Sequence, residues 1–134
     1  MRRGFTLIEL LIVMSIIAAL MSVATPVGLN AVAQAKAANV AGNFRALQQA
    51  VMQMITLEPN PPRAPDVDVL EYLYTQKYIS TKPSGFEVRY DEARKAYVIK
   101  YTQSDIDPLK VKNIYASIEI DTNTGQLVLY VLLP

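Results

Sequence analysis

Residues 4–35 of the chain read GFTLIELLIVMSIIAALMSVATPVGLNAVAQA, and this stretch decides the fold. From Leu10 to Ala35 it contains no charged side chain. As a helix that rises 1.5 Å per residue, this uncharged segment would be about 39 Å long, whereas the hydrocarbon core of a bilayer is about 30 Å thick. The sequence therefore predicts a membrane-crossing helix near the N-terminus of a 134-residue chain.

Two ordinary interpretations of this stretch leave one residue unexplained. Arg2 and Arg3 precede it, which predicts a cytoplasmic N-terminus with the rest of the chain outside. A cleaved signal peptide fits the basic start and the small residues Ser22-Val23-Ala24, and a plain signal anchor fits the hydrophobicity. Neither explains Glu9, because a carboxylate in the apolar run opposes insertion and has no task in a discarded peptide.

A third interpretation accounts for the whole pattern. The run Gly4-Phe5-Thr6-Leu7-Ile8-Glu9-Leu10-Leu11-Ile12-Val13 resembles the processing site of bacterial type IV prepilins and of type II secretion pseudopilins. The resemblance implies that a leader, Met1 to Gly4, is removed by cleavage after Gly4, and that the new terminal Phe5 is N-methylated. The hydrophobic segment is kept, and Glu9 falls at the acidic position of that family.

The chemistry of Glu9 favours a role in assembly. A carboxylate in a transmembrane helix costs about 2.5–3.5 kcal/mol on insertion scales, so such residues are kept where they find a partner. Cleavage before Phe5 creates an amine near the depth of Glu9, and a neighbouring subunit can bring its own amine to this carboxylate. The pairing is strong at low dielectric, although desolvation removes part of the gain. We predict that Glu9 and Phe5 set subunit register and membrane extraction; a passive, protonated Glu9 is the alternative.

The helical pattern continues beyond the membrane segment. Apolar residues at a three-to-four spacing predict one helix from Phe5 to about Leu57, where a proline cluster ends it. The stripe comprises Leu29, Val32, Val40, Phe44, Leu47, Val51 and Met54, and we expect its part around Phe44 and Leu47 to face a sheet.

Pro26 and Gly28 interrupt this predicted helix. Proline removes one backbone hydrogen bond and clashes with the preceding turn. The resemblance implies that the helix bends or melts locally here when it packs into a filament. Many relatives carry a glycine some residues earlier, where this chain has Ala18, so we expect a shorter melted stretch.

The remaining sequence predicts an α+β head, and the whole chain is expected to have a pilin-like fold: one long N-terminal helix packed against a small C-terminal antiparallel β-sheet. The predicted domains are the leader (1–4), the transmembrane and polymerisation half of the helix (5–29), its amphipathic half (30–57) and the head (58–134). In the head we expect a helix capped at Asp68 and ending near Lys77, and a loop over 102–112. Alternating patterns predict strands over 86–90 and 114–121, and hairpin turns predict that each is followed by another strand, over 96–101 and 127–133. The last of these is apolar on both faces, so we expect both of its sides to be covered.

Composition excludes several classes of function. The chain has no Cys and no His, so it has neither a disulfide framework nor a thiolate or histidine catalyst. A net charge of +1 gives no basic footprint for nucleic acid. The oxygen-bearing residues Asp121, Asn123 and Gly125 suit a hairpin turn better than a calcium loop, and Asp105 with Asp107 have no diagnostic spacing, so no metal or cofactor is assigned. We interpret the protein as a non-enzyme.

The sequence thus predicts a structural subunit of a type IV pilus or pilus-like filament, held in the bacterial inner membrane as a single-pass precursor and then polymerised at the cell surface or in the periplasm. Implied partners are further copies of the chain in a helical filament, a prepilin peptidase and methyltransferase, and an assembly platform with its ATPase. A pseudopilin of a type II secretion system is the alternative. A monomeric, membrane-anchored binding domain is the alternative from another class.

Overall fold

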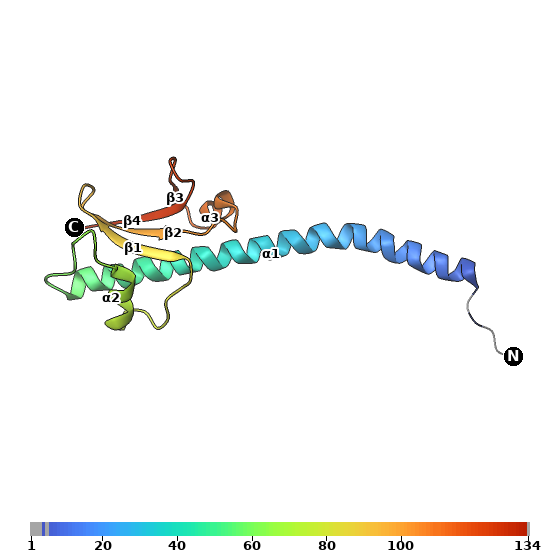
Figure 1. The fold of residues 1–134 in the computed structure, drawn as a ribbon, viewed down its shortest axis with the longest axis horizontal. Coiled ribbons are helices and arrows are strands. Elements are labelled where there is room, and N and C mark those ends of the chain that lie inside the picture. Colours follow the sequence, from blue (N-terminus) through green and yellow to red (C-terminus); the bar gives the residue numbers. More distant parts are fainter. Residues whose placement is uncertain (1–3, 5, 134) are drawn as a thin grey trace. The chain divides into compact units, whose positions relative to one another are not determined.

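The structure is a computed structural model that describes residue 4 and residues 6–133, and the chain divides into two units, Met1–Ala35 and Lys36–Pro134. Helix α1 (Leu7–Leu57) contributes residues to both, which confirms the predicted long N-terminal helix (Figure 1). Phe5, the predicted first residue of the mature chain, lies outside the described residues, as do residues 1–3 of the predicted leader. The two units are described separately below.

The first unit contains the uncharged half of α1. Every described residue from Gly4 to Val32 is exposed, and large apolar side chains such as Ile12 and Leu20 are 53% and 65% exposed. Pro26 lies inside the helix, and α1 is helical through Pro26 and Gly28. The predicted bending or melting of this region belongs to the packed filament and stays a prediction.

The second unit is built on a four-stranded antiparallel sheet. Its strands are β1 (Phe86–Asp91), β2 (Ala96–Tyr101), β3 (Glu119–Ile120) and β4 (Leu127–Leu132), in the order β1-β2-β4-β3. β2 pairs with β1 on one side and with β4 on the other, so that Val88 lies opposite Ile99, which lies opposite Leu129. The sheet and the helices together confirm the α+β class.

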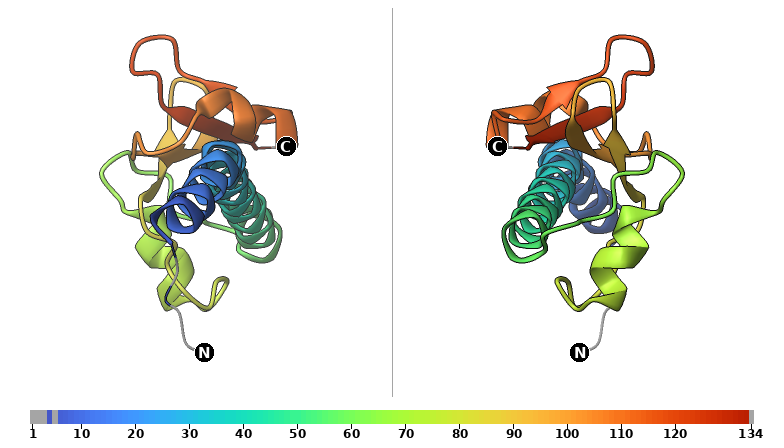
Figure 2. Two further views of the ribbon diagram at one scale, coloured as in Figure 1. Left: turned by 90° about the vertical axis from the view of Figure 1, so that its right-hand side faces the viewer. Right: turned by 90° about the vertical axis from the view of Figure 1, so that its left-hand side faces the viewer.

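One face of this sheet packs on the second half of α1 (Figure 2). Phe44 of α1 and Phe86 of β1 meet edge to face with ring centroids 5.0 Å apart. The residues that α1 buries are Ala37, Val40, Ala41, Phe44, Leu47, Ala50, Val51 and Met54. This confirms that the stripe around Phe44 and Leu47 is the core side, whereas Leu29 and Val32 are exposed.

The two short helices agree only in part with the sequence prediction. α2 (Val69–Thr75) begins at the predicted cap Asp68, whose carboxylate accepts a hydrogen bond from the Glu71 backbone N–H at 3.3 Å. α3 (Pro108–Ile114) occupies the last five residues of the region predicted as a loop, 108–112. Asp107 caps α3 and Pro108 stands at its start, which is the usual N-terminal signature of a helix.

The strand predicted over 114–121 is also wrong, because only Glu119–Ile120 pairs with β4. Ile114 ends α3, and Lys112 donates from its ammonium group to the Ile118 carbonyl oxygen at 3.0 Å. The apolar residues at 114, 116, 118 and 120 therefore alternate in sequence without forming one strand. A capped helix and the turn that follows it override the period-two pattern.

The predicted two-sided burial of the last strand is confirmed in part. Leu127, Leu129 and Val131 of β4 join the core, and Val128 on the other face is 2% exposed. Leu132, near the end of the strand, is 69% exposed.

Candidate processing and assembly site

The start of α1 is closed by a reciprocal pair of hydrogen bonds between Thr6 and Glu9. The Glu9 backbone N–H donates to Thr6 Oγ1 at 3.2 Å, and the Thr6 backbone N–H donates to Glu9 Oε2 at 3.4 Å. The Thr6 carbonyl oxygen accepts from the Leu10 N–H at 3.1 Å, which is the first helical bond. This arrangement is a capping box, in which a Thr at the N-cap and a Glu three residues later satisfy each other's backbone N–H.

Sequence reasoning predicted a role for Glu9 and missed its partner. The signal was available, because Thr6-Leu7-Ile8-Glu9 has the Thr-x-x-Glu spacing of a capping box directly before an apolar run. The resemblance to a processing motif implied roles for Gly4, Phe5 and Glu9 and none for Thr6. Gly4, at the predicted cleavage position, is exposed, and Phe5 lies outside the described residues.

The helix that follows is long and apolar enough to cross a membrane. The apolar stretch of this helix that would span the bilayer is not buried inside the structure. Two of its serine side chains bond within the helix. Ser15 donates to the Leu11 carbonyl oxygen at 2.8 Å and Ser22 to the Ala19 carbonyl oxygen at 2.7 Å. Such internal bonds are what a helix needs where no water is available.

A polar cluster centred on Glu58 lies directly after α1. The Tyr72 and Tyr78 hydroxyls both donate to the Glu58 carboxylate, the second at 2.9 Å. The hydrogen bond to Glu58 raises the pKa of Tyr72 to about 12, with burial as the second cause. The hydrogen bond that Tyr78 itself donates to Glu58 likewise raises the pKa of Tyr78. This cluster ties the segment after α1 to α2 and offers no catalytic group.

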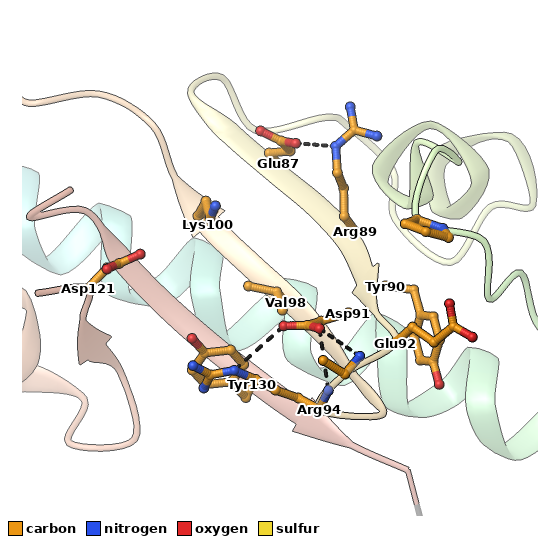
Figure 3. Close-up of a pocket in the computed structure, with 12 residues that line it drawn as sticks. Glu87, Arg89, Tyr90, Asp91, Glu92, Arg94, Val98, Lys100, Asp121 and Tyr130 are labelled. Atoms are coloured by element: carbon orange, nitrogen blue, oxygen red, sulfur yellow. Dashed lines mark hydrogen bonds and ion pairs between the residues drawn. The ribbon is translucent and has the colours of Figure 1, made fainter. Parts of the chain in front are cut away.

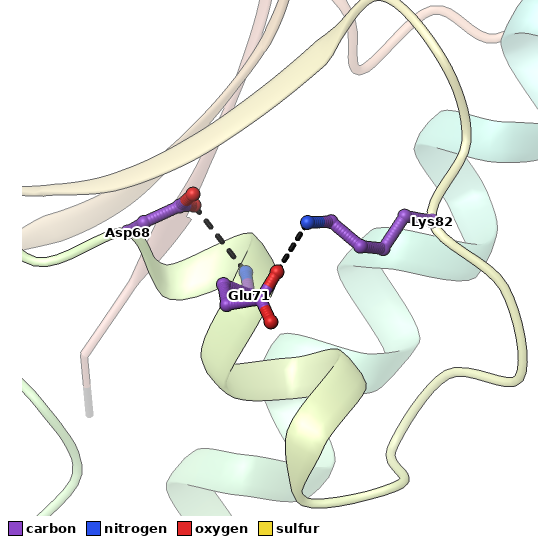
Figure 4. A network of polar contacts seen from close by, with 3 residues as sticks. All are labelled: Asp68, Glu71 and Lys82. Carbon is purple, nitrogen blue, oxygen red and sulfur yellow. Dashed lines mark hydrogen bonds and ion pairs between the residues drawn. The ribbon is translucent and has the colours of Figure 1, made fainter.

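The acidic residues of the head act as caps and turn residues. Figure 4 shows Asp68 at the start of α2 and Glu71 paired with Lys82.

Further acidic residues lie near α3 and in the last hairpin turn. Asp107 caps α3, and Asp105 accepts a hydrogen bond from the Tyr101 hydroxyl at 2.7 Å. Burial and then this bond raise the pKa of Tyr101 to about 12. Asp121 accepts from the Asn123 N–H in the hairpin turn, a bond that lowers the pKa of Asp121.

In the part of the chain that the structure describes, no three His, Cys, Asp or Glu side chains lie close enough together to hold a metal ion. The carboxylates suggested by a calcium pattern are instead engaged as described above.

The open face of the sheet carries a groove of about 540 Å³ (Figure 3). Four of its charged side chains form two pairs, and three further charged residues, Glu92, Lys100 and Asp121, also line it. Glu87 bonds Arg89, and Asp91 lies 3.6 Å from Arg94, whose guanidinium stacks on the Tyr130 ring at 4.3 Å. The groove therefore holds two ion pairs, one of which lies beside the Tyr130 ring.

Comparison with known families identifies the N-terminal segment. Residues 1–25 match the family model described as the prokaryotic N-terminal methylation motif, so the chain carries a type IV prepilin-like signal. The match supports the pilin-like and pseudopilin-like class, which is structural rather than catalytic. The matched region ends at residue 25, before the head begins. Comparison with curated proteins and with solved structures gives no match.

Proposed function

We propose that this protein is a structural subunit of a type IV pilus or pilus-like filament that polymerises through its hydrophobic N-terminal helix after the leader has been removed. The single observation that carries the proposal is the unburied apolar half of α1, which begins inside the methylation motif matched at residues 1–25. Side chains such as Leu7, Ile8 and Leu20 are 73%, 69% and 65% exposed. At about 25 cal/mol per Å² of apolar surface, such a helix is stable only in lipid or against other copies of itself.

Processing would follow from the motif. A prepilin peptidase and methyltransferase cuts after Gly4 and methylates Phe5 while α1 is in the inner membrane. Glu9 then pairs with the amine of a neighbouring subunit, and the assembly platform with its ATPase draws the subunit out of the membrane. Pro26 and Gly28 mark where α1 bends as it packs. The head, residues 58–134 in this division, stays outside the membrane.

The N-terminus of the mature chain tests this proposal most directly. Mass spectrometry of the protein from its native host should find a chain that begins with N-methylated Phe5. An intact Met1, or a chain cut near Thr25, would contradict the proposal and favour the anchored monomer or the signal peptide. Glu9→Gln should leave the cut and the methylation unchanged and abolish filaments, because it removes the charge and keeps the shape of the side chain.

A pseudopilin of type II secretion is the second candidate. The observation that favours it is the absence of Cys, since many adhesive pilins close a C-terminal loop with a disulfide. Deletion of the gene separates the two roles. Loss of surface filaments identifies a pilus subunit, and loss of enzyme export with unchanged filaments identifies a pseudopilin.

A further inference from the structure

On its outer side, β4 is covered by β3 over its first two residues alone. The pairs are Ile120 with Leu127 and Glu119 with Val128 (Figure 1). Within residue 4 and residues 6–133, no strand pairs with the rest of β4, residues 129–132, on that side, and we call these residues the open edge. An unpaired edge of this kind can pair with a strand of another chain.

The open edge directs free backbone groups outward at Tyr130 and Leu132. In an antiparallel sheet, successive residues of a strand bond alternately to one neighbour and to the other. The Asp121 N–H donates to the Gln126 carbonyl oxygen at 2.8 Å, so the even-numbered residues of β4 face β3. The N–H and C=O groups of Tyr130 and Leu132 therefore point to the side on which the described residues offer them no partner.

The segment that precedes β3 has the right pattern to lengthen this strand. The register of β3 and β4, continued by three residues, would set residues 116–118 opposite residues 129–131. Opposite residues share a face, and the odd-numbered residues of β4 face the core. Ala116 and Ile118 would thus face the core, and Ser117 would face outward. The alternating sequence of this segment therefore fits a longer β3.

In the structure, α1 holds this segment in a turn instead. The Tyr115 hydroxyl donates to Gln48 Oε1, and the Arg45 guanidinium lies 5.0 Å from the centroid of the Tyr115 ring. The Ile118 N–H donates to the Tyr115 carbonyl oxygen at 3.2 Å, which closes a turn over residues 115–118.

The turn and the longer strand exclude each other. The end residues of a β-turn have Cα atoms within about 7 Å of each other, whereas three residues of strand span about 10 Å. The longer strand would therefore carry Tyr115 away from Ile118 and turn its side chain to the face of Ser117. Because α1 packs on the opposite, core face of the sheet, Tyr115 would lose its hydrogen bond to Gln48.

We propose that Tyr115 is a latch between two forms of the head. Bound to Arg45 and Gln48, Tyr115 keeps residues 116–118 in the turn and leaves the open edge available to a strand of another chain. Released, Tyr115 lets residues 116–118 lengthen β3 and cover that edge with the chain itself. This inference does not rest on the proposed function, because all of its residues lie in the second unit, Lys36–Pro134.

Disulfide formation in the full chain, held in detergent micelles, tests this latch. The chain has no Cys, so Ser117→Cys together with Tyr130→Cys introduces its only pair of thiols. In the longer strand the two positions lie directly opposite each other, with Cα atoms about 5.5 Å apart, which suits a disulfide. The rate of disulfide formation at a fixed oxidant concentration reports how often the longer strand forms.

Two further changes, each added to this pair, move the equilibrium in opposite directions. The release variant, Arg45→Ala with Gln48→Ala, removes the latch from the side of α1 and leaves the segment itself unchanged. Ala116→Pro fixes the turn, because Pro favours the second position of a type I turn and neither central residue has a positive φ. The matched control is Lys36→Ala with Gln49→Ala, which removes one exposed cation and one exposed amide from the same helix.

We expect the release variant to form the disulfide about ten-fold faster than the parent pair, since the latched form loses a hydrogen bond and a cation–π contact. Ala116→Pro should slow the reaction several-fold, and the control should react at the parent rate. Circular dichroism checks that each head is folded. If the release variant does not fold, the rate in Ala116→Pro decides by itself.

The contrary results are distinct. Equal rates in the release variant and the control would overturn the latch. An unchanged rate in Ala116→Pro would overturn the longer strand, because the two thiols would then meet without leaving the turn. Disulfide-linked dimers in place of the internal bond would also overturn it, since the open edge would then take a strand of a second copy.

Discussion

The two halves of α1 differ in where their apolar side chains lie: those of the second half are largely buried in the head, and those of the first half are exposed. Residues 36–57 alternate buried and exposed positions, and Phe44, Val51 and Met54 are each 0% exposed. Residues 7–32 are exposed on all sides, although their side chains are more uniformly apolar. The apolar face of an amphipathic helix can thus be buried within one chain, whereas a helix that is apolar on all sides needs lipid or other copies of the chain around it.

A chain that lacks the first half of α1 tests this difference most strongly. A chain that begins at Lys36 should fold, remain monomeric and stay soluble without detergent, because every buried core residue lies at or beyond Ala37. The full chain should require detergent, membrane or a filament. Sedimentation velocity and circular dichroism check both expectations. A truncated head that aggregates would show that the anchor half contributes to the fold of the head.

The largest point-mutation effect is expected at the contact between α1 and the sheet. Phe44→Ala should lower the free energy of unfolding of the head by about 3–5 kcal/mol, because it empties a buried site against Phe86. Denaturant unfolding followed by circular dichroism measures this. Met52→Ala on the same helix is the control, since Met52 is 53% exposed and should change stability by less than about 0.5 kcal/mol.

Alkaline titration should reveal the Glu58 cluster. The pKa of Tyr72 is about 12 in the folded head, above the ordinary value of 10.0. The contribution of this bond is fully present below pH 10 and is lost as the pH rises toward 12, because the unfolded chain releases its proton first.

Tyr72→Phe should lower stability at neutral pH by about 1 kcal/mol and make its fall above pH 10 less steep. Tyr74→Phe is the matched control, because Tyr74 lies on the same helix and is 44% exposed. Thermal melts between pH 8 and 11 check the pair. Equal pH slopes in the Tyr72→Phe and wild-type heads would contradict the assignment of this bond.

The smallest effect is expected at the start of α2. Asp68→Ala removes an exposed N-cap and should cost about 0.5 kcal/mol of the stability of the head, the low end of the range for such caps. Asp66→Ala, two residues earlier and exposed, should be close to neutral. A cost at Asp66 as large as that at Asp68 would indicate a general loss of negative charge rather than a lost cap.

The accuracy of the sequence predictions followed the strength of the local signals. The strands at 86–90 and 96–101 were predicted well, because Asp91 to Arg94 form a short hairpin connection between clear alternations. The error at 108–121 arose where two local signals competed. Asp107 and Pro108 favour a helix, while the later isoleucines suggest a strand, and the helix prevailed up to Ile114.

The residues of the candidate site were likewise predicted only in part. Glu9 could be singled out because a lone carboxylate in an apolar run is costly. Its partner Thr6 was overlooked, since Thr is unremarkable by composition and its role depends on where α1 begins. The contact between Tyr72 and Glu58 joins residues 14 positions apart in sequence, and no periodic pattern predicts such a pair.

The sequence alone determined the anchor, the processing motif and the core stripe of α1, because each is a local pattern of charge and hydrophobicity along one helix. Only the tertiary structure decided the strand order β1-β2-β4-β3, the short β3 and the two tyrosines on Glu58. These depend on which distant segments meet, and many pairings of similar strands bury similar apolar area. The free-energy difference between such pairings lies in packing across the sheet and against α1, which one-dimensional patterns do not encode.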